Sequence, residues 1–444
     1  MRHPDVVIIM TDEERNAPTY EGSDLKAWRE EALPARHWFK QNGVSFERHY
    51  TGSLACVPSR PTLFTGHYPD LHGVTQTDGL GKDASDSRMR WLRPGEVPTI
   101  GHWFKAAGYD THYDGKWHIT HADLIDPETG LPIPTNTENG EVIEENVKTY
   151  LEANPLEEFG FSGWVGPEPH GAPLAGNSGF IRDNLIAERV VKWLKDRYLR
   201  RESGDAEALR PFLLIASFVN PHDIVLFPAW RRQEDNPIKK SDLDPPKVPE
   251  PPTRHEDLSS KPAAQIAYKN AYFSGYGPQS RVKKIYERNE QEYRNFYYRL
   301  HLEVDGPIDS VRKIISENAL NETVIFRTSD HGDLLGAHGG LHQKWFTLYD
   351  EATRVPFQVV RTGSNPTTPK TISNAPTSHV DLIPTALGLA GLKEKELSEK
   401  LSDSFTEMHP LPGYDLSPLI ENQNEDRFLE RGVYMMTRDN VLEG

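Results

Sequence analysis

The chain has 444 residues, of which 36% are hydrophobic and 26% charged, and this composition excludes wholesale disorder. Its length suits one large α/β unit better than one small module. The 66 acidic residues outnumber the 50 basic ones, so the net charge is −16. We therefore expect no nucleic-acid partner, because binding to phosphates needs clustered Lys and Arg.

The apolar runs are short throughout the chain. None approaches the ~20 residues that a membrane span needs, so no membrane partner is expected. The run at 6–10 is too short for the core of a signal peptide, so a cytoplasmic location is expected unless a leader has been removed. Cys56 is the single cysteine, which excludes an internal disulfide and a cysteine-based zinc site.

Apolar runs typical of buried parallel strands alternate with amphipathic stretches typical of helices. In chain order, the expected strands are 6–10, 44–46, 109–113, 211–217 and 323–327. The expected helices are 36–42, 100–107, 184–200 and 296–315, the last kinked or split at Pro307. This alternation predicts an α/β fold with a large, mostly parallel (mixed) sheet between helices. Residues 228–290, rich in Pro and charge, are expected to have little regular structure.

Three expected strands end in polar clusters, which are Asp12-Glu13, Asn220-Pro221-His222 and Asp330-His331. In open α/β sheets, ligands bind beyond the carboxyl ends of the strands. If the strands are parallel neighbours, the clusters share one edge of the sheet. Any loop can place one polar cluster after a strand, but three made of metal-binding or acid–base residues favour a functional site.

Asp12, Glu13 and Asp330 would repel one another at such an edge, and burying them uncompensated is costly. A cation among them removes this cost. Oxygen ligands suit Ca²⁺ or Mg²⁺, and His331 adds a nitrogen ligand that leaves Mn²⁺ open. The alternative is that Asp12 caps a helix and His331 is a hydrogen-bonded core residue.

Residues 56–66 read CVPSRPTLFTG, in which a small nucleophilic side chain precedes a proline suited to the first turn of a helix. Free N–H groups at that helix start favour a bound anion, and Arg60 adds a fork of donors. Cys56 there is either a thiol nucleophile of low pKa or an ordinary buried cysteine.

This segment resembles the sulfatase signature of the alkaline-phosphatase-like superfamily, in which the cysteine is oxidised to formylglycine. Further segments match the family in order along most of the chain. They are residues 6–15, 115–118 (GKWH), 217–222 (SFVNPH), 329–333 (SDHGD), Lys344, 380–385 and 416–420. The resemblance implies an alkaline-phosphatase-like fold and a formylglycine-generating enzyme as a maturation partner.

By this resemblance, Asp12, Glu13, Asp330, His331 and residue 56 hold one divalent ion, expected to be Ca²⁺, with Mn²⁺ or Mg²⁺ as alternatives. The family often has a second aspartate where this chain has Glu13, whose longer arm would reach the metal directly or through water. The remaining implied site residues fall into two groups. Arg60, Lys116 and Lys344 bind the sulfate oxygens. His118 and His222 act in proton transfer, and Asp330 takes or orients the proton of the nucleophile.

His222 is the implied general acid for the leaving alcohol, and His118 the base that allows sulfate to leave. His338 and His342 are candidates for contact with substrate. Each residue also has a plainer interpretation: a solvated lysine, a structural histidine or a helix-capping arginine.

The expected function is hydrolysis of a sulfate ester of a small molecule or a saccharide. Two alternatives stay open: a phosphonate monoester or phosphodiester hydrolase with the same nucleophile, and a non-catalytic metal-binding scaffold. Residues 1–424 are expected to form the catalytic domain. Residues 425–444 would then begin a reduced or incomplete antiparallel subdomain, with its first strand at 432–436.

Overall fold

The computed structural model describes residues 3–78, 82–169, 175–233, 238, 244–271, 280–344, 347–364, 366–421 and 426–438. Its main sheet has seven strands. Across the sheet they are β4 (Asp110–Gly115), β5 (Phe212–Ser217), β1 (Asp5–Thr11), β6 (Thr323–Ser329), β7 (Phe357–Thr362), β2 (Val44–Phe46) and β8 (Lys370–Ile372). The first four pair in parallel, and β7 runs antiparallel to both of its neighbours. The expected mostly parallel mixed sheet is therefore confirmed.

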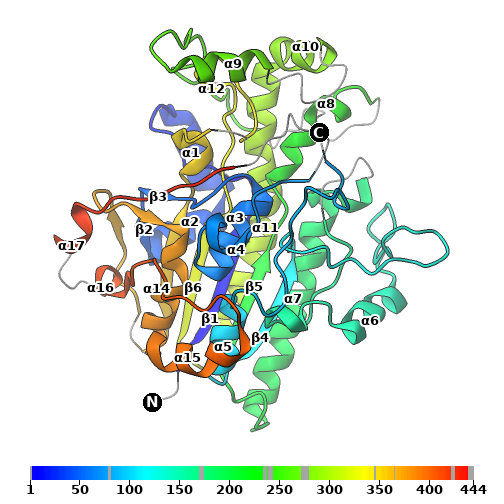
Figure 1. The fold of residues 1–444 in the computed structure, drawn as a ribbon, viewed down its shortest axis with the longest axis vertical. Helices are drawn as coiled ribbons and strands as arrows, with labels where there is room; N and C mark the ends of the chain where they lie inside the picture. The colour runs from blue at the N-terminus through cyan, green and yellow to red at the C-terminus, as the bar shows by residue number, and fades with distance from the viewer. Residues whose placement is uncertain are drawn as a thin grey trace.

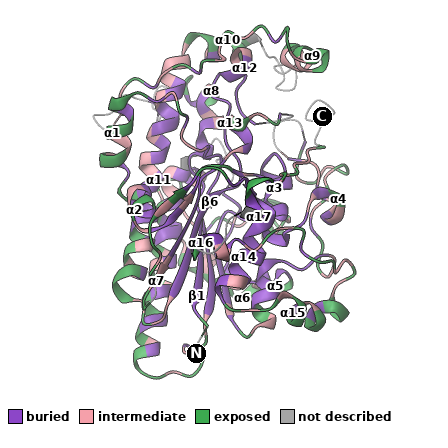
Figure 2. Cartoon of the chain, turned by 90° about the vertical axis from the view of Figure 1, so that its left-hand side faces the viewer, coloured by how far each residue is buried: buried purple, intermediate pink, exposed green. Residues whose placement is uncertain are grey.

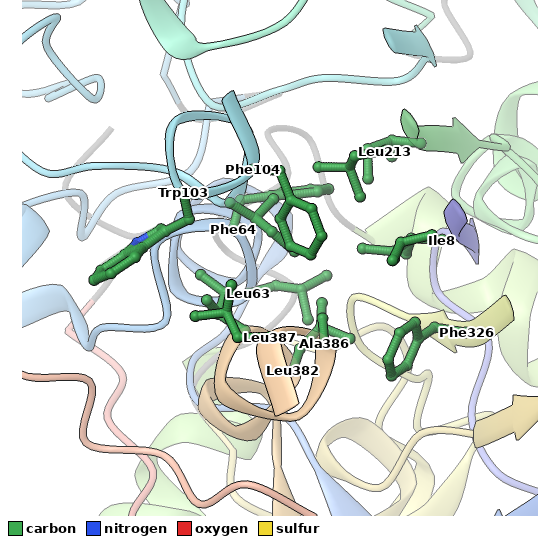
Figure 3. Close-up of a cluster of buried hydrophobic side chains, with 14 of the residues drawn as sticks. Ile8, Leu63, Phe64, Trp103, Phe104, Leu213, Phe326, Leu382, Ala386 and Leu387 are labelled. Carbon is green, nitrogen blue, oxygen red and sulfur yellow. The ribbon is translucent and has the colours of Figure 1, made fainter. Parts of the chain in front are cut away.

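The central strand β1 is buried on both faces, as its continuous apolar run predicts. Its side chains alternate between two cores because successive residues of a strand point to opposite faces. Val6 and Ile8 join the core under α3 (Cys56–Thr65), α5 (Ile100–Ala106) and α14 (Leu382–Leu389). Figure 3 shows part of this core, in which Ile8, Phe64, Phe104 and Leu387 belong to one buried cluster.

The opposite face of β1 packs on a second layer of helices. Val7 and Ile9 share a core with α2 (Pro34–Asn42), α7 (Gly179–Glu202) and α11 (Glu290–Asn318). The strands lie between these two helical layers in Figure 2, where they are coloured as buried along their length.

The described residues also contain shorter elements. The other helices are α1 (Ser23–Ala32), α4 (Pro69–His72), α6 (Glu144–Ala153), α8 (Phe227–Trp230), α9 (Ala263–Ala271), α10 (Ser280–Arg288), α12 (Ala337–Gly340), α13 (Asp350–Thr353), α15 (Glu394–Leu401), α16 (Ser417–Ile420) and α17 (Asp426–Leu429). Short 3₁₀ turns occur at Glu157–Phe159, Ala175–Asn177, His222–Leu226, His379–Asp381 and Ser402–Ser404. β3 (His49–Tyr50) and β9 (Thr377–Ser378) pair as a separate small sheet. Within the described ranges, we find no helix long and apolar enough to cross a membrane.

Two expectations about secondary structure were wrong, and a third was wrong in part. Residues 228–290 contain α9 and α10, which lie at the end of the molecule opposite the N-terminus (Figure 1). Val282 and Tyr286 of α10 face a buried cluster, and this helical spacing is hidden among charged residues. Residues 234–237, 239–243 and 272–279 lie outside the described residues.

The helix α11 continues through Pro307, so the expected split there is wrong, while the alternative of a kink at Pro307 stays a prediction. Val304 and Ile308, on either side of the proline, belong to the core. Residues 432–436 form no strand. In this segment Met436 donates its N–H to Gly52 O at 3.0 Å, outside any assigned strand.

Candidate active site

The three polar clusters predicted from the sequence do share one edge of the sheet. β5 and β6 are the two parallel neighbours of β1, so the residues after all three strands emerge side by side. β4 is the next parallel strand and brings Lys116 to the same edge. The fold therefore assembles the site at the carboxyl ends of its parallel strands.

Four side chains gather at the centre of this edge. Ligand atoms of Asp12, Cys56, Asp330 and His331 all lie within 4.8 Å of one another, and all four residues are buried. Cys56 Sγ lies 2.9 Å from His331 Nε2 and 3.7 Å from Asp12 Oδ1. His331 Nδ1 faces Gly332 O at 3.0 Å, which leaves Nε2 for the cluster. Two carboxylates, an imidazole and residue 56 are a donor set that fits a divalent cation.

Cys56 is the first residue of α3, as the proline pattern predicts. Pro58 lies in the first turn, where a missing N–H costs no helical hydrogen bond. The helix ends at Gly66, whose left-handed conformation (φ 71°) lets its N–H reach Thr62 O. Residue 56 is thus held at the positive end of a ten-residue helix and is only 2% exposed.

Arg60, one turn further along α3, ties the two cluster carboxylates together. Its Nη2 donates to Asp12 Oδ2 at 3.0 Å and its Nε to Asp330 Oδ2 at 2.9 Å. Its Nη1 donates to Lys116 O and to Ser217 Oγ. Every part of this fully buried guanidinium is engaged by the protein, so Arg60 organises the carboxylates that the sequence places in the metal group.

Lys116 follows β4 and reaches Asp12 Oδ2 with its Nζ at 2.6 Å. The position of Lys116 depends on the preceding Gly115. A Cβ added at residue 115 would lie 1.9 Å from Ser217 O, and its φ of 101° favours glycine. Burial alone would raise the pKa of Asp12, but the positive charges of Lys116, His222 and Arg60 outweigh it and hold that pKa well below its usual value. Asp12 is therefore ionised and ready to bind a cation.

Glu13 and Lys344 form a buried pair, with Lys344 Nζ 2.7 Å from Glu13 Oε2. Burial raises the pKa of Glu13 well above its usual value, although Lys344 opposes this. The pKa of Lys344 is raised despite its burial, by the electrostatic effects of Cys56 and Glu13. Glu13 also belongs to a second group of ligand atoms, with Asp12 and His222, that lie within 4.8 Å of one another.

His118 is held by two acidic residues that the sequence did not single out. Glu168 accepts the backbone N–H groups of Trp117 and His118 at 3.0 and 2.9 Å and fixes the left-handed turn at His118 (φ 52°). Asp78 Oδ1 lies 2.8 Å from His118 Nε2. Burial alone would lower the pKa of His118, but Asp78 raises it to about 9. Neither acid belongs to a recognisable motif, so only the fold reveals them.

Replacing Asp78 with asparagine is expected to lower the pKa of His118 and to change how stability depends on pH. A histidine whose folded pKa lies above its unfolded value of about 6.5 stabilises the fold fully below pH 6.5, and this stabilisation is lost as pH rises through about 9. Urea unfolding at pH 6 and 9.5 should show this loss in the wild type and little of it in Asp78→Asn. Asp83→Asn, at an exposed aspartate of the same loop, is the control.

His222 begins the 3₁₀ turn after β5 and lies beside Asp12 and Glu13, and its role as the general acid stays a prediction. His338 and His342 lie outside both groups of ligand atoms. His338 sits between Glu256 and Glu351, at 3.0 and 3.1 Å. His342 stacks on Tyr286, and burial lowers its pKa to about 3. Contact of these two residues with substrate stays a prediction.

Comparison with known proteins gives a consistent result. A sulfatase family model matches residues 4–392. The uncharacterised sulfatase YidJ of Escherichia coli is 26% identical over 418 residues, covering 89% of this chain and 70% of that protein. The chain spans about two thirds of the length of most curated relatives that it matches.

Solved structures share the fold. A 2-O GAG sulfatase superposes with a TM-score of 0.60 at 20% identity, covering 97% of this chain and 76% of its own. A phosphonate monoester hydrolase from Silicibacter pomeroyi superposes with a TM-score of 0.54 at 20% identity, covering 95% and 77%. Because the family model spans most of the sequence, this chain belongs to the sulfatase family.

Proposed function

We propose that this protein hydrolyses a sulfate monoester, using formylglycine made from Cys56 together with one divalent ion. The observation that carries the proposal is the position of residue 56. It starts α3 inside the group formed by Asp12, Asp330 and His331, within the electrostatic reach of Lys116 and Lys344. A nucleophile beside a cation site and two buried lysines suits attack on a tetrahedral anion.

The bound ion and the formylglycine supply positive charge and a hydroxyl nucleophile. The chain's own residues supply the rest. Lys116 and Lys344 bind the sulfate oxygens and place positive charge inside an acidic protein. Asp330 orients the proton of the attacking hydroxyl, and Arg60 keeps Asp330 and Asp12 in place. In the net reaction, water is consumed, the ester S–O bond breaks, and alcohol and sulfate leave.

His222 and His118 move the protons. His222 gives a proton to the oxygen of the leaving alcohol, since it lies beside Asp12 at the edge of the group. His118, in its neutral form, takes the proton that must leave residue 56 when sulfate is released, and because Asp78 raises its pKa to about 9, this step should quicken as pH rises towards that value. Its pair with Asp78 then stabilises the protonated imidazole.

Ca²⁺ is the proposed ion, with Mn²⁺ or Mg²⁺ as the alternatives, because oxygen donors predominate and His331 adds one nitrogen. A saccharide sulfate or a small-molecule sulfate is the proposed substrate. The 2-O GAG sulfatase of the same fold makes the saccharide the first choice. A formylglycine-generating enzyme is the proposed maturation partner.

Two measurements test the proposal. Mass spectrometry of the tryptic peptide with residue 56, from protein made in its native host, should show an aldehyde in place of the thiol. An aryl sulfate should then be turned over faster than an aryl phosphonate. The opposite order would favour the phosphonate hydrolase, which has a structural neighbour of that name and whose substrate is also a tetrahedral anion. A fully unmodified thiol would favour a non-catalytic scaffold.

His222→Ala is expected to lower turnover by about 10²–10⁴-fold, the usual contribution of a general acid. Alkyl sulfates should lose more than activated aryl sulfates, because a good leaving group needs no proton. The comparison of kcat for the two ester classes checks this. An equal loss for both classes would contradict the role of His222 as the acid.

A further inference from the structure

A cavity of about 400 Å³ lies on the β2 side of the site and shares no residue with the two groups of ligand atoms. Its walls come from the loop after β1 (residues 14–19), α1, α2, the end of β2 and the segment before β7. Figure 1 shows α1, α2 and β2 gathered on this side of the molecule. The volume falls within the range of about 300–1,000 Å³ that is usual for ligand pockets.

The lining of the cavity is basic, although the chain as a whole is acidic. Seven arginine and lysine side chains line it against four glutamates, an excess of three positive charges in a protein of net charge −16. Concentrated positive charge in a concave surface attracts anions locally, even when the net charge repels them at long range.

Several of the lining cations are already neutralised. Arg36 binds Glu14 through two nitrogens at 3.0 and 2.8 Å and also binds Asp305. Arg29 pairs with Glu21 at 3.3 Å. The exposed rim also carries Glu47, a negative charge that opposes part of the excess. The attraction for an anion therefore rests on the cations that these acids do not reach.

Arg15 is the principal cation of this kind. It is 4% exposed, and its Nη2 donates to Tyr20 Oη at 2.9 Å. Its Nε and Nη1 have no hydrogen-bond partner, and no carboxylate of the described residues lies within 4 Å of its guanidinium. Burying a guanidinium with two unsatisfied N–H donors costs free energy. A bound oxyanion would accept hydrogen bonds from both nitrogens at once.

Two further cations stand nearer to solvent. Lys26, on α1, is exposed and forms no ion pair with a described residue. Arg354, before β7, reaches Asp350 only at 3.5 Å, and that carboxylate is 61% exposed. Both side chains line the cavity.

We propose that this cavity, which we name the Arg15 cavity, is an accessory binding site for an oxyanion group, a sulfate or a carboxylate. Arg15 forms its inner contact, and Lys26 and Arg354 form its rim. The group comes either from free inorganic sulfate or from a second anionic substituent of a longer substrate. The proposal does not depend on the chemistry at residue 56.

The Arg15 cavity is linked to the active site by hydrogen bonds and by side-chain packing. The N–H of Arg15 donates to Tyr297 Oη at 3.0 Å, and that hydroxyl donates to Glu13 O at 2.6 Å. Gly332, next to His331, packs so tightly on Arg15 that an added Cβ would lie 2.6 Å from Arg15 Cβ. An anion bound by Arg15 would therefore contact the loop that also carries Asp12 and Glu13, next to the segment that carries His331.

Isothermal titration with sodium sulfate, at constant ionic strength maintained with chloride, tests the site in solution. We expect two sulfate equivalents per wild-type chain, one at the active site and one in the Arg15 cavity. The double variant Lys26→Gln/Arg354→Gln should weaken one of them by roughly ten- to a hundred-fold and leave the other unchanged. Lys195→Gln, which removes an exposed lysine of α7 outside the cavity, is the control and should change neither. A single equivalent that the double variant leaves unaffected would overturn the proposal.

A crystal soaked in sodium selenate gives the position directly. An anomalous peak within hydrogen-bonding distance of the Arg15 guanidinium supports the proposal, and a peak at the active site alone contradicts it. This measurement tests the cavity independently of the proposed sulfatase activity, because it requires no turnover.

Saccharides with one and two anionic groups then distinguish the two sources. If a second substituent of the substrate fills the cavity, the double variant should bind the doubly charged saccharide about ten-fold more weakly and the singly charged one normally. If free sulfate fills it, both saccharides should bind as they do to the wild type, while the second sulfate equivalent is still lost.

Discussion

Cys56→Ala is expected to lower turnover of an aryl sulfate by about 10⁴–10⁶-fold, the scale of loss when a catalytic nucleophile is removed. In the proposed mechanism residue 56 provides the attacking atom, while Asp12, Asp330 and His331 can hold a cation without it. The variant keeps the small size of the side chain at the start of α3, so the fold should survive.

Kinetics on the purified variant, alongside thermal unfolding, check this expectation. Ser53→Ala is a matched control, because it also removes one heavy atom from a buried residue a few positions earlier, and it should retain normal turnover. Turnover above about a tenth of the wild-type rate in Cys56→Ala would exclude residue 56 as the nucleophile.

Arg60→Met is expected to lower the free energy of unfolding by about 3–5 kcal/mol, the range for breaking a buried ion pair by removing one partner. Methionine keeps part of the side-chain volume but supplies none of the donors that bind Asp12 and Asp330. Asp12 then keeps its ion pair with Lys116, while Asp330 loses its pair with an arginine.

Urea unfolding measures this loss, and repeating it with a chelator and with excess Ca²⁺ adds a second observable. A cation between the carboxylates replaces part of the missing positive charge, so Ca²⁺ should stabilise the variant more than the wild type. Arg231→Met breaks an exposed pair with Glu292 and should change stability little. Equal losses in the two variants would mean that Arg60 does not hold the carboxylates together.

The parts of the fold that follow from local patterns were predictable from the sequence. β1, β5 and β6 are continuous apolar runs, and such runs are typical of strands buried on both faces. The site edge was predictable for the same reason, since Asp12 and Asp330 come directly after two of these strands. Neighbouring parallel strands necessarily bring such residues together.

The rest depended on contacts between distant segments. Asp78 and Glu168 hold His118 across 40 and 50 residues of sequence, and no spacing rule links them. The pair of Glu13 with Lys344 is of the same kind. The α10 helix was missed because its apolar residues are few and its charged residues many, so its pattern resembles that of a solvated loop until its packing partners are known.

The central place of β1 in the sheet bears on the order in which the chain is made. This strand is synthesised first, yet its two partners begin only at residues 212 and 323. During translation, β1 and the later α3 segment therefore stay without their neighbouring strands until most of the chain has been made. We expect this interval to be the time when a modifying enzyme can reach Cys56, because in the finished fold the thiol is 2% exposed. Protein that is refolded from a denatured, unmodified state without that enzyme should therefore recover its native fold, but Cys56 should remain a thiol.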